Sequence, residues 1–415
     1  MSDVVVIGAG LAGLAAALRL AQAGRSVTLA TKGPGGLQLS QGTVDILGYT
    51  PERVSRPLEA VASVAPEHPY ASLGADAVAA AVTWLADQLG PDLLVGDPSR
   101  NVHLPTAVGA LRPTAMAQPS MLSGDAVGGR SYAVVGVRQL KDFPADLIAG
   151  NLARSTAPDG GALEASAAWI DLPARRGEAD PNPVTYARAM DEEAFAARFA
   201  RAVADAAGPA DVVAVPAVLG SRRRSVWRQV TDAVGRDVCE IPMPPPSVPG
   251  LRLYEALLGL IRAAGVRFVQ GSRIVGCTRS GDAIESVTLA AAGGPRQLRA
   301  ASFVYAPGGF ESGALEVDSY GAIAEPVFGL PLTATDALPL ISSVYWGPHP
   351  LFEVGVRADA AGRPSDAAGA AVHPNLYVAG GIIAGAERWR EKSGDGIAVA
   401  TAVRAADHIT GGNDE

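Results

Sequence analysis

One stretch near the start of the chain constrains its fold more than any other. The apolar run Val4–Ile7 is typical of a buried parallel strand, and it leads directly into the pattern Gly8-x-Gly10-x-x-Gly13. A helical stretch rich in alanine and leucine follows, and a second apolar run, Ser26–Ala30, comes after it. The sequence therefore predicts a βαβ unit that carries a dinucleotide-binding fingerprint.

Each glycine of this fingerprint has its own physical role. Gly8 permits a tight turn, Gly10 lets a pyrophosphate approach the backbone, and Gly13 lets the helix lie close to the strand. Free N–H groups and the positive end of the helix then face the phosphates. An ordinary glycine-rich turn is the alternative, but a strand before the motif and a helix after it favour a binding site. The predicted phosphate-binding residues are Gly8, Ala9, Gly10, Leu11, Ala12 and Gly13.

The second predicted strand ends without the acidic residue that commonly binds the adenosine ribose. Thr31 and Lys32 occupy these positions instead. A cofactor that stops at one phosphate, such as FMN, therefore becomes admissible beside FAD. Alternatively, Thr31 or a backbone group binds the ribose, and the sequence leaves both possibilities open.

Three later segments are further candidates for cofactor contacts. A glycine-rich loop over residues 33–47 carries small polar side chains suited to a phosphate, a ribityl chain or a flavin edge, although a plain surface loop is the alternative. Two buried strands, Phe303–Ala306 and Asn375–Ala379, end in glycines, and a glycine-rich turn opens the last helix. From these segments we predict cofactor contacts at Ser40, Gln41, Gly42, Thr43, Gly308, Gly309, Gly380, Gly381, Gly394 and Gly396.

A chain of 415 residues is too long for one ordinary core, so two interleaved domains are expected. The proline-rich stretch Cys239–Leu253 marks a crossing between them. We predict an α/β fold in which a Rossmann-like FAD/NAD(P)-binding domain with a central parallel sheet is interleaved with a mixed α/β cap or substrate domain. The flavin-binding domain takes residues 1–97, 250–311 and 371–415, and the cap domain takes 98–249 and 312–370.

Composition excludes several classes of protein. A hydrophobic content of 48% with 18% charged residues excludes a largely disordered chain, and a net charge of −8 gives no basic surface for nucleic acid. The apolar stretch Val4–Leu18 lacks a basic leader and contains three glycines, so we expect a cytoplasmic protein with no membrane span. Two cysteines are too few for a four-cysteine iron–sulfur cluster, and no metal site is predicted.

Isolated polar residues are weaker candidates. Arg112 can hold a phosphate or carboxylate in its planar fork, although a surface ion pair is the commoner role for a single arginine on a strand. His68 and Tyr70 stand near a helix start where they could touch a substrate, but packing is the favoured interpretation. His373 precedes Pro374 and fits a turn.

Taken together, these motifs resemble those of flavoproteins with two dinucleotide-binding segments, as in fumarate-reductase-type enzymes. The chain more closely resembles the family formed by the B subunits of anaerobic glycerol-3-phosphate dehydrogenases, nearly over its whole length. The segments that carry this likeness are 8–14, 40–45, 68–70, 109–112, 134–136 with 142–143, 245–248 with Gly250 and Arg252, 325–326 with 329–330, 363–365 and 375–376.

This resemblance implies a cytoplasmic flavoprotein with FMN, or alternatively FAD, that pairs with a larger FAD-bearing catalytic subunit. A membrane-associated iron–sulfur subunit would hold the complex at the periphery of the inner membrane. The reaction would convert glycerol 3-phosphate to dihydroxyacetone phosphate and pass electrons to the quinone pool. Arg112 and Arg252 match family positions, so they are the candidate cations for the substrate phosphate; no catalytic base is identified.

Two other interpretations remain open. The chain could be a stand-alone FAD-dependent oxidoreductase that acts on another small substrate, or a flavin-free scaffold subunit. The segment Glu387–Lys392 is also more charged than the glycine-rich family pattern. The flavin-facing loop that contains this segment is therefore expected to differ from that of its relatives.

Overall fold

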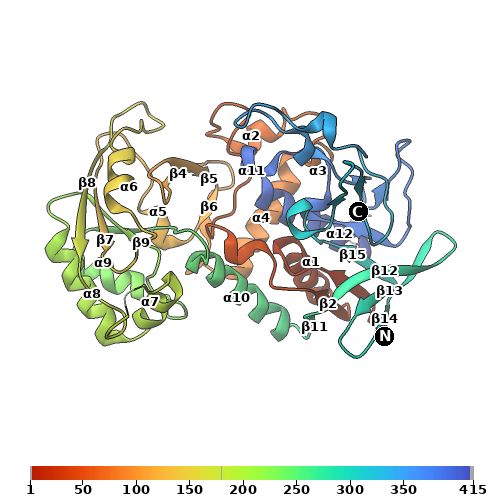
Figure 1. Ribbon diagram of the computed structural model, residues 1–415, viewed down its shortest axis with the longest axis horizontal. Helices are drawn as coiled ribbons and strands as arrows, with labels where there is room; N and C mark the ends of the chain where they lie inside the picture. Colours follow the sequence, from red (N-terminus) through yellow and green to blue (C-terminus); the bar gives the residue numbers. More distant parts are fainter. Residues whose placement is uncertain (1, 179, 412–415) are drawn as a thin grey trace.

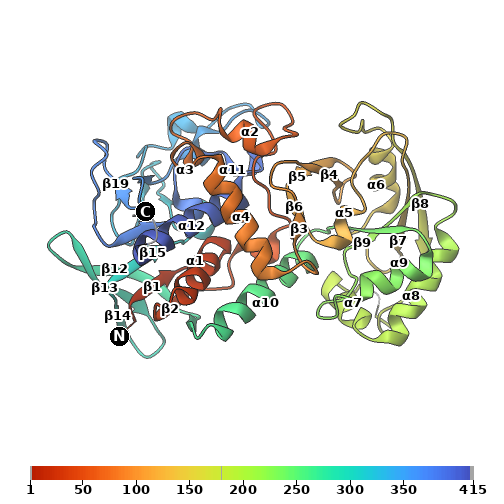
Figure 2. The ribbon, with the colours of Figure 1, turned by 180° about the vertical axis from the view of Figure 1, so that it is seen from behind.

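The computed structural model, described here for residues 2–178 and 180–411, has two lobes (Figures 1 and 2). The first lobe is built on a parallel five-stranded sheet in the order β11-β2-β1-β15-β20. Its strands are β1 (Val4–Ile7), β2 (Val27–Thr31), β11 (Arg267–Gln270), β15 (Ser302–Tyr305) and β20 (Leu376–Val378).

The two faces of this sheet follow the alternation of side chains along each strand. Val4 and Val6 pack into a core formed with the helices, whereas Val5 and Ile7 pack into a second core on the opposite face. The helical face is covered by α1 (Leu11–Gln22), α4 (Ala75–Leu89), α10 (Val248–Ala263) and α12 (Gly394–Thr410). The other face is covered by an antiparallel sheet of β12 (Arg273–Ser280), β13 (Ala283–Ala290) and β14 (Arg296–Arg299).

The predicted βαβ unit is present, and its glycines explain the close packing at its turn. Gly8 has φ +108°, a conformation that side chains with a Cβ rarely adopt, and a Cβ there would overlap the carbonyl oxygen of Ala306. A Cβ at Gly13 would in turn overlap the carbonyl oxygen of Gly8. Strand, turn and helix therefore touch backbone to backbone.

The second lobe lies to the left in Figure 1 and contains its own parallel sheet in the order β10-β9-β7-β8. Its helices and strands enclose a separate core that includes Phe143 and Phe199. The lobe is inserted in the chain between α4 and α10 of the first lobe. Its elements are β7 (Ser131–Val137), α6 (Ala145–Leu152), β8 (Glu164–Ile170), α7 (Pro183–Met190), α8 (Glu193–Ala206), β9 (Val212–Pro216), α9 (Val226–Val234) and β10 (Asp237–Ile241).

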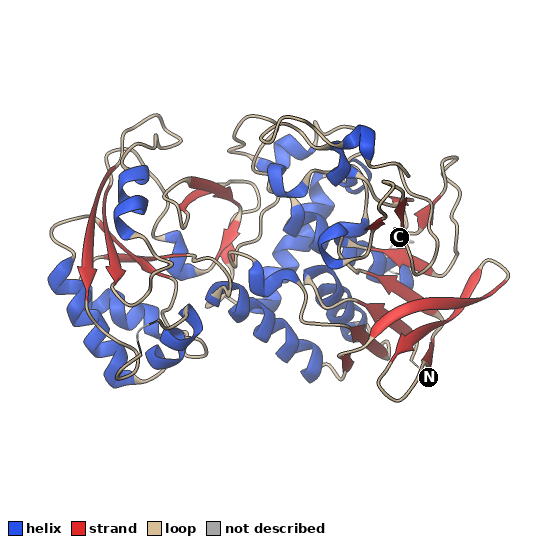
Figure 3. Cartoon of the chain, in the orientation of Figure 1, coloured by secondary structure: helices blue, strands red, loops and turns tan. Residues whose placement is uncertain are grey.

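Shorter elements connect the lobes and surround the first sheet (Figure 3). Residues 312–370, which the sequence-based division places with the cap domain, put Leu315, Phe328 and Val356 into the core beneath the first sheet. The remaining helices are α2 (Pro57–Val61), α3 (Pro69–Leu73), α5 (Pro119–Leu122) and α11 (Arg388–Glu391). The remaining strands are β3 (Val95–Gly96), β4 (Val102–Pro105), β5 (Leu111–Thr114), β6 (Met116–Ala117), β16 (Glu316–Val317), β17 (Ile323–Ala324), β18 (Arg357–Ala358) and β19 (Pro364–Ser365).

The fold class expected from the sequence is confirmed: a Rossmann-like parallel-sheet domain is combined with a second α/β domain. The second sheet is itself wholly parallel. Within the described part of the chain, the helices lack the combination of length and apolar character that crossing a bilayer requires.

The contact between the Gly8 turn and β15 leads to a test. Gly8→Ala should lower the free energy of unfolding by about 3 kcal/mol or more, because the new methyl group is strained at positive φ and has no room beside Ala306. Gly10→Ala is the matched control, since no described atom lies within 4 Å of a Cβ at that position. Urea unfolding measures both variants. Equal stabilities would refute this account of the turn.

Candidate functional site

A cavity of about 450 Å³ lies at the carboxyl ends of the first-lobe strands. This is where open parallel sheets bind nucleotide cofactors, because loops from several strands converge there. The turn from β1 into α1 forms one wall, and the segment after β2 forms another. Residues that follow β15 and β20, Ala398 of α12, and residues at the start of β12 also line the cavity.

The α1 end of this cavity fits a phosphate group. Gly10 is the N-cap residue of α1; the helix has no side-chain cap there and no acidic residue in its first turn. The first N–H groups of the helix are therefore available to an anion, and the helix dipole favours negative charge at that end. Because a Cβ at Gly10 would meet no described atom within 4 Å, the backbone there is open to a close ligand.

The structure brings most of the predicted phosphate-binding and strand-end residues to this one cavity. Predicted residues that line it are Gly8, Ala9, Gly10, Leu11, Ala12, Thr31, Lys32, Gly308, Gly380 and Gly381. Among the described residues, the lining does not include Gly13, Ser40, Gln41, Gly42, Thr43, Gly309, Gly394, Gly396, Arg112 or Arg252.

Several lining residues were not singled out in the sequence. Tyr305 lies at the carboxyl end of β15, and its hydroxyl donates to Glu325 Oε1 at 2.8 Å. Arg273 and Gly35 approach from β12 and from the loop after β2. A rule that counts the last residue of each parallel strand and the loop after it would have found Tyr305 and Gly35, but Arg273 is reached only through the antiparallel layer.

The loop that carries Ser40–Thr43 satisfies much of its own polarity. Ser40 Oγ donates to the Leu37 carbonyl at 2.8 Å, and Thr43 Oγ1 donates to Asp45 Oδ1 at 3.1 Å. The carbonyl of Gly42 accepts a hydrogen bond from Gln118 Nε2 at 3.3 Å. Contacts with the segment that joins the two lobes therefore order this glycine-rich loop.

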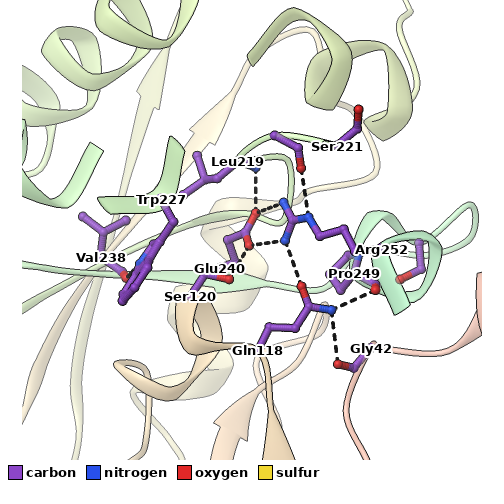
Figure 4. Close-up of polar contacts among 12 residues, drawn as sticks. Gly42, Gln118, Ser120, Leu219, Ser221, Trp227, Val238, Glu240, Pro249 and Arg252 are labelled. Atoms are coloured by element: carbon purple, nitrogen blue, oxygen red, sulfur yellow. Dashed lines mark hydrogen bonds and ion pairs between the residues drawn. The ribbon is translucent and has the colours of Figure 1, made fainter. Parts of the chain in front are cut away.

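Arg252 lies in the junction between the lobes, and Figure 4 shows its partners. Its guanidinium forms a two-pronged ion pair with Glu240 of β10, with Nη1···Oε2 at 2.7 Å and Nη2···Oε1 at 3.0 Å. Its Nε donates to the Gly220 carbonyl at 2.9 Å, and Nη1 also donates to Gln118 Oε1 at 3.1 Å. Both charged residues are buried, at 5% and 3% exposure.

This network compensates the cost of burying Glu240. Burial is the largest single influence on this carboxyl and by itself would raise its pKa, but the Arg252 charge and the hydrogen bonds to the carboxylate together keep the pKa below its usual range. Hydrogen bonds from Ser120 Oγ at 2.6 Å and from the Leu219 N–H at 2.7 Å act in the same direction. Gln118 extends the network, because its Nε2 donates to the Pro249 carbonyl at 2.8 Å as well as to Gly42.

Arg112 belongs to a second charged cluster. Its Nη2 forms an ion pair with Asp45, a residue that is almost fully buried. The Asp45 N–H in turn donates to Asp395 Oδ2 at 3.3 Å, which brings the first turn of α12 to the Ser40–Asp45 loop. Burial, reinforced by the charge of Asp45, raises the pKa of Asp395 to about 7, although Arg112 opposes the shift. Burial and the charge of Arg112 lower the pKa of Lys392.

Tyr70 and His68 pack around the start of α12. The Tyr70 hydroxyl donates to the Ile46 carbonyl at 2.7 Å, and a Cβ at Gly396 would overlap that hydroxyl oxygen. Gly396 is therefore held by close packing on Tyr70. His68 Nδ1 accepts from the Tyr70 N–H at 3.1 Å, and its Nε2 lies 3.1 Å from Glu391 Oε2.

The charged segment Glu387–Lys392 packs against neighbouring loops and makes hydrogen bonds to one of them. The carbonyl of Glu391 accepts from the N–H groups of Gly48 and Tyr49, at 2.7 and 3.0 Å. Arg388 extends Nη2 toward the backbone of Gly309 and Gly381, next to the cofactor cavity. The segment therefore places the Arg388 side chain against two of the predicted cofactor loops.

The chain is similar to known proteins over nearly its whole length. Residues 3–397 match the model of the family described as "FAD binding domain". The B subunit of a probable anaerobic glycerol-3-phosphate dehydrogenase from Halobacterium salinarum is 35% identical, and the alignment covers 97% of this chain and 96% of that protein. The B subunit of the anaerobic glycerol-3-phosphate dehydrogenase from Vibrio vulnificus is 30% identical over 99% of this chain and 96% of its own length. A 3-ketosteroid delta1-dehydrogenase structure from Sterolibacterium denitrificans aligns over 99% of each chain, with 12% identity and a TM-score of 0.46.

The buried ion pair between the lobes can be tested by removing its cation. Arg252→Met should cost about 3–5 kcal/mol in unfolding free energy, because Glu240 would remain buried without a counter-charge. Arg228→Met is the control: its pair with Asp92 is well exposed, so about 0–1 kcal/mol is expected. Adding Glu240→Gln to Arg252→Met should recover part of the loss. Urea unfolding that finds equal costs for the two single variants would contradict the assignment.

Asp395 gives the protein a pH-dependent stability. Its pKa in the folded protein is raised, so the folded state holds the proton longer, and stability is lost as pH rises from about 4 through 7. Asp395→Asn should remove this loss, which we expect to be on the order of 1–2 kcal/mol after screening by Arg112 and solvent. Unfolding curves at pH 5 and pH 8 provide the measurement, with exposed Asp205→Asn as the control. Parallel pH dependence in wild type and Asp395→Asn would disprove the prediction.

Proposed function

We propose that this chain is a flavoprotein subunit that takes part in oxidising glycerol 3-phosphate to dihydroxyacetone phosphate. The chain belongs to the FAD binding domain family and to the family of B subunits of anaerobic glycerol-3-phosphate dehydrogenases. The observation that carries the proposal is the 35% identity over nearly the full length of both chains, combined with a cavity built by the predicted fingerprint. The relatives are named as one subunit of an enzyme, so the family points to a multi-subunit complex.

FAD is the cofactor that we propose for the cavity, in preference to FMN. The missing acidic residue after β2 made FMN admissible beside FAD, but the family model is that of an FAD binding domain. The cavity also extends from Thr31 and Lys32, where an adenosine would lie, past Gly10 to Gly380 and Gly381. The Thr31 hydroxyl donates to the Gly33 carbonyl at 2.6 Å, so backbone groups of this segment are the better candidates for the ribose. When bound, the flavin supplies a two-electron acceptor.

For the substrate we propose the Arg112 cluster. Arg112 is the family-matched cation that keeps a buried nitrogen, Nε, without a hydrogen-bond partner in the described structure. Lys392 contributes a second positive charge near it. Arg252 is less suited to a substrate phosphate, because its donors bind Glu240, Gln118 and Gly220. The pKa of Asp395, about 7, suits a group that takes the hydroxyl proton.

Electrons must leave the flavin after each turnover. We propose that they pass to a partner subunit with an iron–sulfur centre and from there to the quinone pool, and that a larger FAD-bearing subunit shares the oxidation of the substrate. The cysteine content of the chain supports the placement of the iron–sulfur centre on another subunit: Cys239 is buried in the second lobe, whereas Cys277 lies on β12 of the first. Two separated cysteines cannot hold a cluster of the kind that needs four.

The cofactor proposal has a direct test. Gly10→Val should leave a folded protein that has lost most of its flavin, because the side chain projects into the space where a phosphate would approach. Gly259→Val on α10 is the control, since a Cβ there also meets no described atom within 4 Å but lies outside the cavity lining. Circular dichroism checks folding, and chromatography of the released cofactor identifies it; we expect FAD. FMN alone would overturn the choice of cofactor, and protein that cannot be loaded with either flavin would support a scaffold role.

Activity needs a separate readout. The holoprotein, assayed alone and with its companion subunits, should reduce an artificial electron acceptor only when glycerol 3-phosphate is present. Bleaching of the flavin by another small alcohol, with no response to glycerol 3-phosphate, would instead identify a stand-alone oxidoreductase. Arg112→Gln should raise the KM for glycerol 3-phosphate at least tenfold if the guanidinium binds the phosphate.

A further inference from the structure

An unusual concentration of exposed apolar side chains lies on one short segment of the first lobe. Tyr345 is 77% exposed and Trp346 is 81% exposed, and neighbouring aliphatic and aromatic residues are also open to solvent. Proteins rarely leave such side chains together at the surface unless another molecule covers them. We define this apolar face as Leu338, Ile341, Val344, Tyr345, Trp346, Phe352 and Trp389.

Contacts within the face show that its aromatic members form one continuous surface. The rings of Tyr345 and Trp346 pack edge to face with centroids 4.8 Å apart. His349 joins Tyr345 to Phe352, because its Nε2 lies 3.0 Å from the Tyr345 carbonyl and its ring is 6.2 Å from that of Phe352. Phe352 then packs against Trp389 of α11, again at 6.2 Å.

Residues between the exposed side chains anchor the apolar face to a small hydrophobic core. Leu340 and Leu351, which alternate with the exposed residues, pack onto a small core that contains Ile323 and Val354. Two short 3₁₀ turns, Leu338–Leu340 and Pro350–Glu353, each begin with a proline near the first position and limit the freedom of the backbone. The exposed side chains are therefore presented by an anchored surface, which reduces the entropy lost on binding.

The chemistry of the face fits the centre of a protein–protein interface. Residues 338–352 contain no lysine, arginine, aspartate or glutamate. Depletion of charge together with enrichment in tyrosine, tryptophan and phenylalanine distinguishes interface centres from the remaining surface. A membrane is a poorer occupant, because surfaces that bind anionic lipid are rich in lysine and arginine, whereas this chain carries a net charge of −8.

The position of the face relates it to the cofactor cavity. Trp389 is adjacent in sequence to Arg388, whose Nη2 lies beside the backbone of Gly381, a cavity-lining residue. Only the short helix α11 therefore separates this end of the face from the cavity. A protein bound here would stand close to the cofactor.

We propose that this apolar face docks the partner subunit that accepts electrons from the cofactor, and that this subunit presents a complementary apolar surface. The redox role that this inference gives to the partner rests on the proposed function. The naming of the relatives as B subunits supplies the expectation of a different subunit, and the exposed aromatic surface beside the cavity supplies its location.

The test uses the full chain co-expressed with the companion subunits of its own complex. Tyr345→Ser combined with Trp346→Ser should weaken assembly at least tenfold, measured by sedimentation of the purified subunits, because exposed aromatic anchors dominate interface energies. Leu147→Ser combined with Val127→Ser is the matched control on the second lobe, where these residues are 48% and 46% exposed. The control should assemble like wild type. Flavin content and thermal unfolding of both variants should stay unchanged.

Each other outcome overturns the proposal in a recognisable way. Unaltered assembly of the Tyr345/Trp346 variant would remove the face from the interface. Concentration-dependent self-association of the wild type that this variant abolishes would assign the face to a second copy of the chain, and binding to phosphatidylcholine–phosphatidylglycerol vesicles would assign it to a membrane.

Hydrogen exchange provides a measurement that needs no variant. Peptides over residues 338–352 and the peptide that contains Trp389 should become protected in the complex relative to the free holoprotein. Unchanged exchange there would equally overturn the proposal. A complex that assembles through this face but contains no flavin in this chain would refute the proposed function while leaving the docking surface intact.

Discussion

The direct backbone contact between the Gly8 turn and the end of β15 determines where everything else in the first lobe lies. Because a methyl group would not fit between Gly8 and the Ala306 carbonyl, β1, β15 and the start of α1 meet with nothing between them. That closeness brings the first N–H groups of α1 to the same edge of the sheet as the loops after β2, β15 and β20. A single steric constraint thus generates both the fold of the sheet and the wall of the cavity.

The second lobe depends on a different interaction. Glu240 and Arg252 would each be costly to bury alone, but as a hydrogen-bonded pair they hold β10 against the start of α10. Gln118 links this pair to the Gly42 carbonyl, and through it to the loop that also carries Ser40 and Thr43. The orientation of the lobes and the conformation of this loop are therefore coupled through one polar network (Figure 4).

The charged residues near α12 also form a hydrogen-bonded network that joins separate segments of the chain. Arg112 binds Asp45, whose N–H donates to Asp395, while Glu391 joins His68 to the loop at Gly48. The charged segment Glu387–Lys392 supplies side chains that pack against these loops. One consequence is that Trp389 is turned to the surface, where it extends an apolar face that begins at Leu338. The local chemistry of the cavity and the surface available to a partner are thus linked through α11.

The sequence alone determined the features that depend on local spacing. The strand Val4–Ile7, the glycines at 8, 10 and 13, and the alanine- and leucine-rich helix after them follow from periodicity and from the special conformations of glycine, and the structure contains them as predicted. Family membership was also within reach, because motifs such as 40–45 and 245–248 are short and specific. Only the tertiary structure decided which residues meet across long separations. Arg252 could not be told from a ligand-binding cation until Glu240, Gln118 and Gly220 were seen around it, since the same guanidinium binds a carboxylate or a phosphate equally well. Likewise, residues 312–370 lack a periodic pattern, so only their packing beneath β1 and β15 placed them with the first lobe. The same packing left the side chains of the apolar face, such as Tyr345 and Trp346, in solvent.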